Sequence, residues 1–218
     1  MEKIKQIKRD ILNTSYEAKA CHIGSALSCV DILVDLFYVK KIKPENFLFS
    51  KASGVACYYA ILADLGYFSK DKLVEYLTKY PLPSKEVSVV SHSFGSLGHG
   101  LSVATGLALA DRKRDIYVLL SDGECQEGST LEAVSFAKQH FLTNLFVIVD
   151  NNGLQACGST KDIIDMTYIW EFMLKSLPNC WIADTIKGDG IDFMENDHNW
   201  HYKNLDKKLL DKALKQIV

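Results

Sequence analysis

Two polar segments, each directly after an apolar run, contain the residues best suited to do chemistry. Asp122 lies in the segment Ser-Asp-Gly-Glu after the run IYVLL, and Asn152 lies just past the run LFVIVD. Carboxylates at the end of a buried strand are costly to bury unless a positive group meets them. The acidic segment therefore either forms a solvated turn or holds a cation.

The two segments should meet at one edge of a sheet. Parallel strands joined by right-handed crossovers point the same way, so Asp122 and Asn152 would both lie at the carboxyl edge, where open α/β folds bind ligands. A carboxylate, an amide oxygen and a nearby backbone carbonyl suit Mg²⁺ or Ca²⁺ completed by phosphate oxygens and water. Gly123 would let the backbone approach such a ligand closely. Each Asp-Gly or Asn-Gly pair by itself is more often only a turn.

Alternating segments predict the elements that would position these residues. The runs IYVLLS and LFVIVD read as buried strands, residues 101–112 and 129–140 as helices, and residues 86–91 as a candidate strand. Ser129 followed three positions later by Glu132 is a capping-box signature for the start of the second helix. Strands that alternate with helices predict an α/β fold, with a doubly wound, mostly parallel sheet and helices on both faces.

The first half of the chain is expected to be mostly helical. Apolar residues recur with a period near 3.6 in its first segment, which is typical of an amphipathic helix. Helices are expected at residues 1–19, 30–38, 54–65 and 70–80. No repeat, low-complexity tract or linker interrupts the sequence, so residues 1–218 are expected to form one domain.

The composition argues against several classes of function. The chain has 218 residues, of which 48% are hydrophobic and 24% charged, and a net charge of −2, as in an ordinary globular domain. Its dispersed lysines and arginines argue against binding to nucleic acid or to a membrane surface. The six cysteines stand singly and no apolar run reaches membrane length, so a cytoplasmic protein with reduced thiols is expected.

The polar segments also carry a family resemblance. The segment SDGECQEGSTLEA, with NN about thirty residues later, resembles the thiamine diphosphate motif of transketolases. Four further blocks are similar to transketolase segments in the same order: KACHIGSALSCVDIL, FLFSKASGVACYYAILADLG, GSLGHGLSVATGLALA and ADTIKGDGIDFMENDHNWHY. The resemblance covers nearly the whole chain and implies the thiamine-diphosphate-binding fold, in its N-terminal, diphosphate-binding (PP-type) half.

The resemblance implies a set of cofactor-binding residues. Asp122, Asn152 and the backbone carbonyl of Leu154 would bind Mg²⁺, for which Ca²⁺ could substitute, and the metal would bridge the two phosphates of thiamine diphosphate. The other cofactor-binding positions that it implies are Ser53, Gly95, Leu97, Gly98, Gly123, Glu124 and Lys187. From the residues alone, a solvated side chain is an equal alternative for Lys187.

Four residues are catalytic candidates by the same resemblance. His22 and His201 match family histidines near the thiazolium and the diphosphate, where they would orient substrate or cofactor and could shuttle protons. Glu127 matches a family glutamate that contacts a second glutamate at an interface between subunits, and one pKa of such a carboxylate pair must rise. His99 replaces the glutamine of the family's Gly-Gln-Gly turn. The alternative for each histidine is an ordinary surface or core position.

The sequence departs from the family at several places. Ser53 occupies the position of a histidine beside the reacting carbon, another family histidine has no counterpart in YPLPSKEV, and Ser121 replaces the first glycine of GDG. Between DIIDMTYIWEFMLKS and CWIADTIKG the family has a further strand, a DGHD segment and a helix. The fold must therefore lose a strand–helix unit or complete it with a partner.

The reaction that the resemblance implies requires a second chain. In this family the glutamate that acts on the pyrimidine ring belongs to a separate domain, to which nothing in the 218 residues corresponds. The leading hypothesis is the N-terminal subunit of a split transketolase, which transfers a two-carbon ketol unit between sugars or sugar phosphates together with a C-terminal, pyrimidine-binding subunit. We expect a dimer of the chain alone and a heterotetramer with the partner. The alternatives are a subunit of another thiamine diphosphate-dependent decarboxylase or carboligase, and a non-catalytic, cofactor-binding interaction subunit.

Overall fold

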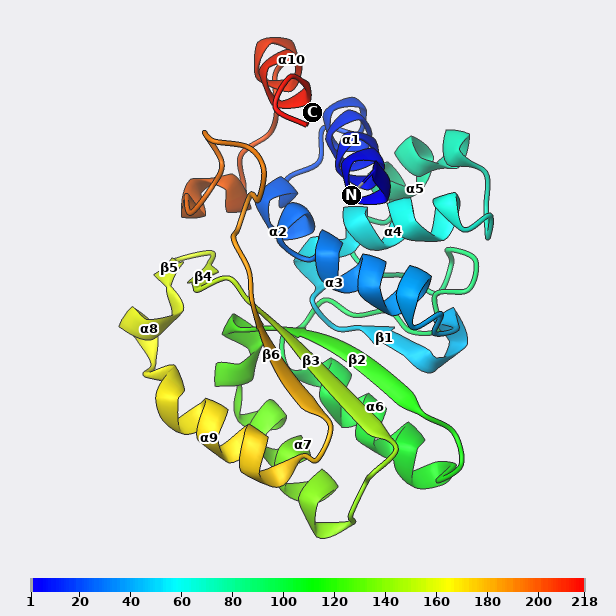
Figure 1. The fold of residues 1–218 in the computed structure, drawn as a ribbon, viewed down its shortest axis with the longest axis vertical. Coiled ribbons are helices and arrows are strands. Elements are labelled where there is room, and N and C mark those ends of the chain that lie inside the picture. Colours follow the sequence, from blue (N-terminus) through cyan, green and yellow to red (C-terminus); the bar gives the residue numbers. More distant parts are fainter. Residues whose placement is uncertain (1, 218) are drawn as a thin grey trace.

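The fold is organised around one parallel β-sheet. The computed structural model describes residues 2–217, and its main sheet has four parallel strands in the order β1-β2-β3-β6 (Figure 1). These strands are β1 (Phe47–Phe49), β2 (Ile116–Ser121), β3 (Leu145–Asn151) and β6 (Cys180–Asp184). Two short antiparallel strands, β4 (Leu154–Gln155) and β5 (Gly158–Ser159), follow β3. The expected parallel α/β architecture is confirmed.

The register of the central strands brings the two polar segments together. β2 and β3 are paired in parallel along their length, and the last pair is Ser121 with Asp150. Because both strands run the same way, Asp122 and Asn152 follow at the same edge of the sheet, as predicted. Most residues of β2 and β3 are buried, so the carboxyl ends of these strands lie at the centre of the fold.

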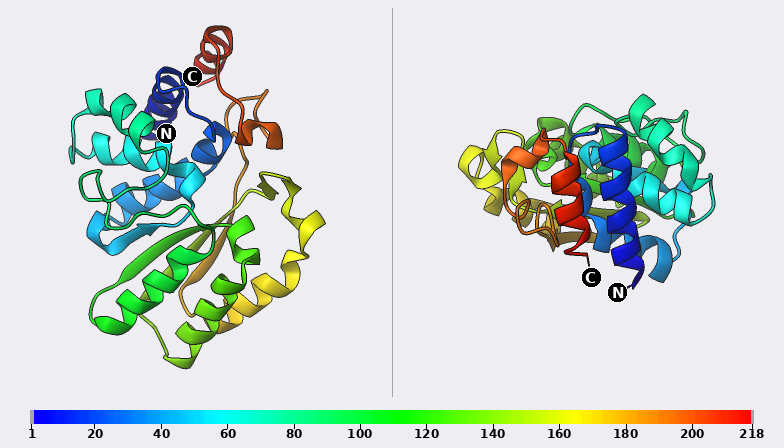
Figure 2. Two further views of the ribbon diagram at one scale, coloured as in Figure 1. Left: turned by 180° about the vertical axis from the view of Figure 1, so that it is seen from behind. Right: turned by 90° about the horizontal axis from the view of Figure 1, so that it is seen from above.

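Helices cover both faces of the sheet (Figure 1; Figure 2). One face is covered by α6, α7 and α9, and the other by the N-terminal helices, with α10 beside α1. Ala104 and Ala108 on one side of α6 are buried in the core. The helices are α1 (Glu2–Glu17), α2 (Ile23–Ser28), α3 (Val30–Val34), α4 (Val55–Asp64), α5 (Leu73–Lys79), α6 (His99–Ala110), α7 (Gly128–Gln139), α8 (Thr160–Ile163), α9 (Met166–Ser176) and α10 (Lys207–Leu214).

Two local predictions are wrong. Residues 86–91 form turns and irregular backbone rather than a strand, although Val87 and Val90 are buried in the core. The capping box at the start of α7 is absent: Glu127 precedes the helix, and the Ser129 hydroxyl instead donates to the Gly98 carbonyl at 3.2 Å. Tertiary contacts therefore override the local signal at both places.

β6 is an edge strand, and one face of it is partly open to solvent. α9 leads into β6 through a connection of only a few residues, and no strand within residues 2–217 pairs with the outer side of β6. Trp181, which is 45% exposed, stacks on Phe146 with ring centroids 6.1 Å apart, and Phe146 stacks on Tyr117 at 4.6 Å. The expected further strand–helix unit would come directly before β6, and the described residues contain no such unit.

Two further expectations concern the chain as a whole. All six cysteines are free thiols, in agreement with their spacing in the sequence. Among residues 2–217, we find no helix with the length and apolarity needed to cross a bilayer.

Candidate cofactor site

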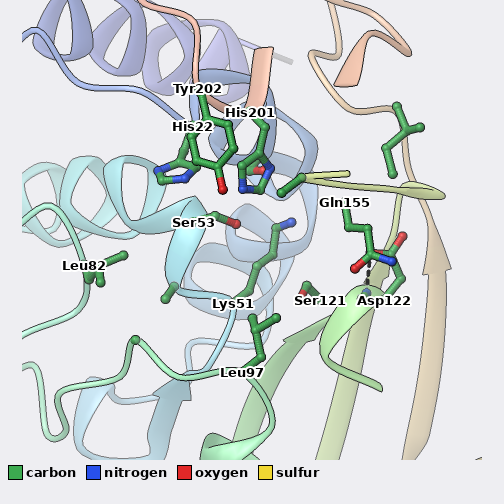
Figure 3. A pocket seen from close by; sticks show the side chains of 16 residues that line it. His22, Lys51, Ser53, Leu82, Leu97, Ser121, Asp122, Gln155, His201 and Tyr202 are labelled. Atoms are coloured by element: carbon green, nitrogen blue, oxygen red, sulfur yellow. Dashed lines mark hydrogen bonds between the residues drawn. The ribbon is translucent and has the colours of Figure 1, made fainter. Parts of the chain in front are cut away.

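A cavity of about 360 Å³ opens at the carboxyl edge of the sheet (Figure 3). Its wall is built by segments around Lys51, Gly95, Asp122, Leu154 and His201, which are distant in the sequence. A cavity in which a few polar groups converge among apolar ones is the default place to look for a bound ligand. The position agrees with the ligand site predicted from the ends of β2 and β3.

Asp122 forms the acidic part of this wall, in the turn after β2. It is 1% exposed, and its Oδ1 accepts from the Gly123 amide at 2.8 Å while its Oδ2 accepts from the Gly153 amide at 2.6 Å. These two bonds hold the carboxylate across the ends of β2 and β3. Burial raises the pKa of Asp122, and the charge of Lys51 opposes that effect. A cation bound to the carboxylate would offset the cost of its burial.

The other two predicted metal ligands lie in the turn after β3. Asn152 Oδ1 accepts from the Leu154 amide at 3.1 Å, and its Nδ2 lies 3.3 Å from Ser28 Oγ, so the hydrogen bonds orient the amide. The Leu154 carbonyl accepts a long bond of 3.4 Å from Lys187 Nζ. Carbonyl and carboxylate oxygens have two lone pairs each, so all three groups keep capacity for a further contact.

This set of donors fits a hard divalent cation. The described residues contain no group of three or more His, Cys, Asp or Glu arranged to hold a metal. Mg²⁺, however, is commonly held by one or two carboxylates together with neutral oxygens, water and substrate phosphates. A metal at Asp122 would therefore depend on the bound ligand to complete its coordination.

Several predicted cofactor-binding residues line the cavity beside Asp122 and Leu154. Ser53, Gly95, Leu97 and Gly123 all do so. A Cβ atom at Gly123 would lie only 2.9 Å from Gln155 Oε1 and 3.3 Å from its Cβ, so a side chain would crowd this wall. Glycine at position 123 therefore lets the Gln155 side chain approach the backbone closely.

Two buried lysines face the carboxylates. Lys51 is 2% exposed and its Nζ lies 3.1 Å from Oδ2 of Asp150, which is fully buried. Burial lowers the pKa of Lys51, but the nearby charges, that of Asp150 first, outweigh this effect and raise it. Burial, followed by the charge of Lys51, lowers the pKa of Lys187 to about 8. Lys187 is 0% exposed, so the solvated alternative for this residue is wrong.

His22 and His201 come together on the opposite side of the cavity. Their rings meet edge to face with centroids 4.6 Å apart, and the His22 amide donates to the His201 carbonyl at 3.0 Å. Lys187 Nζ lies 3.2 Å from His201 Nδ1. Burial, then the charge of Lys187, lowers the pKa of both rings, that of His201 to about 3. Both imidazoles are therefore neutral at neutral pH.

Six of the predicted site residues do not line the cavity. Asn152 and Lys187 lie directly behind Leu154, to which both are bonded. The Glu124 carboxylate is fully buried and accepts from Ser50 Oγ at 2.5 Å and from the Ser121 amide at 3.0 Å. The other three are Gly98, His99 and Glu127, of which the last two are exposed at the starts of α6 and α7. A ligand could therefore contact Gly98, His99 or Glu127 only at a surface outside this cavity.

Sequence reasoning missed a buried network around Asp150. Ser28 Oγ donates to Asp150 Oδ2 at 2.6 Å, the Thr185 hydroxyl donates to Oδ1, and Lys51 forms the ion pair described above. Asp150 ends an apolar strand just as Asp122 follows one, and that similarity is the signal that could have identified it. Lys51 lies in the block FLFSKASG that resembles the family, but only the fold brings it to this carboxylate.

The chain resembles known proteins along most of its length. Residues 2–173 match the family model described as "Transketolase, thiamine diphosphate binding domain". The chain is 37% identical to one subunit of the apulose-4-phosphate transketolase of Actinobacillus succinogenes, over 93% of this chain and 90% of that protein. It is 30% identical to the protein of the same name from Phocaeicola vulgatus, over 96% of this chain and 90% of that one.

Longer transketolases match over only part of their length. Human transketolase is 30% identical over 90% of this chain, which corresponds to 38% of the human protein. The crystal structure of transketolase from Campylobacter jejuni superimposes with a TM-score of 0.83 over 99% of this chain and 42% of its own, at 23% identity. This likeness confirms the predicted thiamine-diphosphate-binding fold.

The alignments also concern the strand–helix unit before β6 that the sequence predicts to be missing from this chain. The alignment with the Actinobacillus protein spans 249 residues, although only 93% of this 218-residue chain takes part in it. That protein therefore carries several dozen residues without a counterpart here. The family match, the relatives and the fold agree that the chain belongs to the transketolase family, as a thiamine diphosphate-binding domain.

Proposed function

We propose that this chain is the thiamine diphosphate-binding subunit of a two-subunit transketolase, which transfers a two-carbon ketol unit from a ketose phosphate to an aldehyde. The observation that carries the proposal is the match to two proteins that are each named as one subunit of a transketolase, over 90% of the length of each. Human transketolase extends well beyond the matched region, which is 38% of its length. A chain of this kind would therefore act together with a second subunit.

The residues at the acidic end of the cavity would hold the cofactor by its diphosphate. Thiamine diphosphate, when bound, supplies the carbanion chemistry of ketol transfer. Asp122, Asn152 and the Leu154 carbonyl would hold Mg²⁺, or Ca²⁺ in its place, against the diphosphate. Gly123 would let the backbone approach a phosphate, and Gly95 and Leu97 would border the ring end of the cofactor. These assignments are supported by the placement of the three oxygens at one edge of the sheet.

His22 and His201 would act on the substrate. Both rings border the cavity and both have a lowered pKa, so each would meet a sugar hydroxyl as a neutral imidazole. A neutral imidazole can accept a proton at one nitrogen while it donates from the other. The contact between Lys187 Nζ and His201 Nδ1 leaves Nε2 of His201 as the nitrogen for the substrate.

The substrate is best sought among the sugar phosphates named in the relatives. Both of the matched single subunits belong to apulose-4-phosphate transketolases, so apulose 4-phosphate is the first donor to test. Ser53 lines the cavity at the position where the family resemblance implies a histidine. A serine occupies less space there than an imidazole, which would leave room for a ketose of different shape.

The partner would carry the pyrimidine-binding domain and close the cavity. The proposed assembly is a dimer of the chain alone and a heterotetramer of two such chains and two partners. Closed twofold symmetry is the usual solution for a surface of this kind. We propose that Glu127, which is exposed at the start of α7, meets a glutamate of another subunit; His99 is exposed at the start of α6.

A non-catalytic, cofactor-binding subunit is the second candidate. Two observations favour it: Ser53 in place of a histidine, and the several dozen residues of the Actinobacillus protein that have no counterpart here. Such a protein would bind thiamine diphosphate but would support no turnover with any partner.

The two candidates are separated by reconstitution. The chain would be expressed with and without the product of a neighbouring gene of pyrimidine-domain type, and ketol transfer from apulose 4-phosphate would be followed by product analysis. Activity that needs both chains, Mg²⁺ and thiamine diphosphate supports the transketolase. A complex that binds the cofactor but transfers no ketol unit from any ketose phosphate supplied would contradict it and favour the second candidate.

A further inference from the structure

Lys51 is a buried cation in the wall of the cavity, and the predictions from the sequence include no role for it. It precedes a short 3-10 turn at Ala52–Gly54, and its side chain extends into the cavity with the amine between His201 on one side and Asp122 on the other (Figure 3). The side chain is 2% exposed, and the carboxylate of its ion-pair partner, Asp150, is fully buried. Burying two charges costs several kcal/mol per ion in effective terms, so such a pair is weak support for a purely stabilising role.

Asp150 is held by other partners besides Lys51. Ser28 Oγ donates to its Oδ2 at 2.6 Å and the Thr185 hydroxyl donates to its Oδ1. Both carboxylate oxygens therefore have a hydrogen bond that does not involve the lysine. Asp150 is a rigid, fully hydrogen-bonded anchor, and it fixes the position of the Lys51 amine.

The ammonium group of Lys51 keeps donors to spare. An ammonium has three N–H donors, and among residues 2–217 the only polar partner found for Lys51 Nζ is Asp150. The second buried lysine near the cavity differs in this respect: Lys187 Nζ contacts the Leu154 carbonyl at 3.4 Å and His201 Nδ1 at 3.2 Å, and Lys187 does not line the cavity. Lys51 is therefore the buried amine with both access to the cavity and unused donors.

The unused donors lie in the same wall as the proposed diphosphate site. Asp122 and Gly123 line the cavity together with Lys51, and Asp150 is two residues before Asn152. Asp122 would hold a divalent metal that neutralises part of the charge of the diphosphate. The fixed ammonium of Lys51 would meet the remaining negative charge, and hydrogen bonds between charged groups are stronger than those between neutral ones.

We propose that Lys51 is a direct ligand of the bound diphosphate, positioned by Asp150, so that this site retains part of its affinity for diphosphate without a divalent metal. The inference rests on the proposed function, because it takes the cavity to be the diphosphate site. It adds a specific property to that function: a second, built-in cation that supports binding when Mg²⁺ is scarce.

The test uses the full chain and inorganic pyrophosphate, with binding measured by calorimetry in excess EDTA and in excess Mg²⁺. The variant is Lys51→Met together with Asp150→Asn, which removes both charges and leaves neither one buried and unpaired. A matched control is Lys3→Met with Asp64→Asn, a second Lys–Asp pair, with N–O distance 2.5 Å, that lies outside the cavity. Thermal unfolding shows whether each variant is folded.

Wild-type chain should bind pyrophosphate in EDTA, and the Lys51 double variant should bind it about tenfold or more weakly. The loss should be smaller in Mg²⁺, and the control pair should bind as wild type does. Equal affinity of the folded double variant and wild type in EDTA would overturn the inference, as would wild-type binding that requires Mg²⁺ absolutely. With either of these two results, binding of pyrophosphate in Mg²⁺ would leave the proposed function intact. If wild-type chain bound pyrophosphate neither in EDTA nor in Mg²⁺, both the inference and the proposed function would be overturned.

A crystal structure of wild-type chain with pyrophosphate in EDTA provides an independent measurement if the double variant does not fold. The expected result is a phosphate oxygen within hydrogen-bond distance of Lys51 Nζ. Pyrophosphate bound away from Lys51 would overturn the inference.

Discussion

Asp122 is the only carboxylate among the three proposed metal ligands, so it should control the metal dependence of binding. Asp122→Asn keeps the shape of the side chain and one acceptor for the amides of Gly123 and Gly153, but removes the charge. We expect Mg²⁺-dependent affinity for thiamine diphosphate to fall about 100-fold, which corresponds to about 3 kcal/mol. Calorimetry measures this, with Asp162→Asn on the exposed side of α8 as the control. Undiminished affinity in the Asp122 variant would rule out the metal assignment.

His201 should make the stability of the protein depend on pH. Burial and the charges of Lys187 and His22 lower its pKa to about 3, whereas an unfolded histidine has a pKa of about 6.5. Between these values the unfolded chain binds more protons, so the fold loses stability as the pH falls below about 6.5. His201→Gln should therefore reduce the drop in Tm between about pH 7.5 and pH 5.

The control for this measurement is His198→Gln, an exposed histidine three positions earlier. The drop in Tm of the control should equal that of wild type. An unchanged drop in the His201 variant would mean that the neutral, buried imidazole is not a source of acid sensitivity.

Ser53 should affect the choice of sugar more than the affinity for the cofactor. It lines the cavity in the segment after β1, and Ser53→His would place an imidazole where the resemblance implies one. We expect the ratio of kcat/KM for two ketose phosphates to change by about tenfold, a typical effect of altered pocket volume. Steady-state kinetics of the reconstituted enzyme and calorimetry with thiamine diphosphate measure the two effects. A change in cofactor affinity alone would show that Ser53 does not face the substrate.

At the scale of elements, the turn before α6 depends on one glycine. Gly98 has φ 78°, and a Cβ there would lie 2.4 Å from Ser129 Oγ and 2.8 Å from Glu127 Cβ, both at the start of α7. Gly98→Ala should therefore destabilise the protein by about 1–3 kcal/mol and separate the starts of the two helices. Denaturant unfolding measures the loss.

Gly95 provides the matched control in the same turn. It has no positive φ, and an added Cβ would meet only the flexible end of Leu82, at 3.1 Å. Gly95→Ala should change the free energy of unfolding by less than about 0.5 kcal/mol. Equal losses in the two variants would indicate that the turn, rather than the contact with α7, sets the requirement for glycine.

At the scale of the whole molecule, α6 and α7 are the helices through which we expect two copies to meet. Gly106 is exposed in the middle of α6, and an added Cβ would touch nothing within 4 Å, so the isolated fold has room for a side chain there. Gly106→Leu should leave the fold intact but weaken the dimer about tenfold or more, because bulk at a close helix contact forces the copies apart. Sedimentation at micromolar concentration measures the association.

Trp181→Lys on the open edge strand β6 is the comparison for this experiment. It changes a second exposed apolar position, and it should leave the α6 contact unaffected. A dimer that dissociates with Trp181→Lys but not with Gly106→Leu would place the contact at β6 instead. A wild-type monomer, unchanged by partner, Mg²⁺ and thiamine diphosphate, would remove the proposed assembly altogether.

The sequence by itself determined the two central strands, β2 and β3, most helices, and the meeting of Asp122 with the turn that contains Asn152. The physical reason is that buried parallel strands need continuous apolar runs, and that such strands end at a common edge. The apolar pattern failed at residues 86–91 and the capping signal failed at Ser129. At both places a contact with a distant segment was more favourable than the local structure that the pattern predicts.

Only the tertiary structure decided which polar side chains share the cavity. Lys51 and Asp150 lie ninety-nine positions apart, and Ser28 is 122 positions from Asp150, so no spacing in the sequence relates them. The resemblance named Glu124 as a cofactor ligand, but packing buries its carboxylate against Ser50 behind the wall. Burial and the pKa of a side chain depend on charges brought together by folding, which is why the lysines and histidines of this site acquire their properties only in the folded chain.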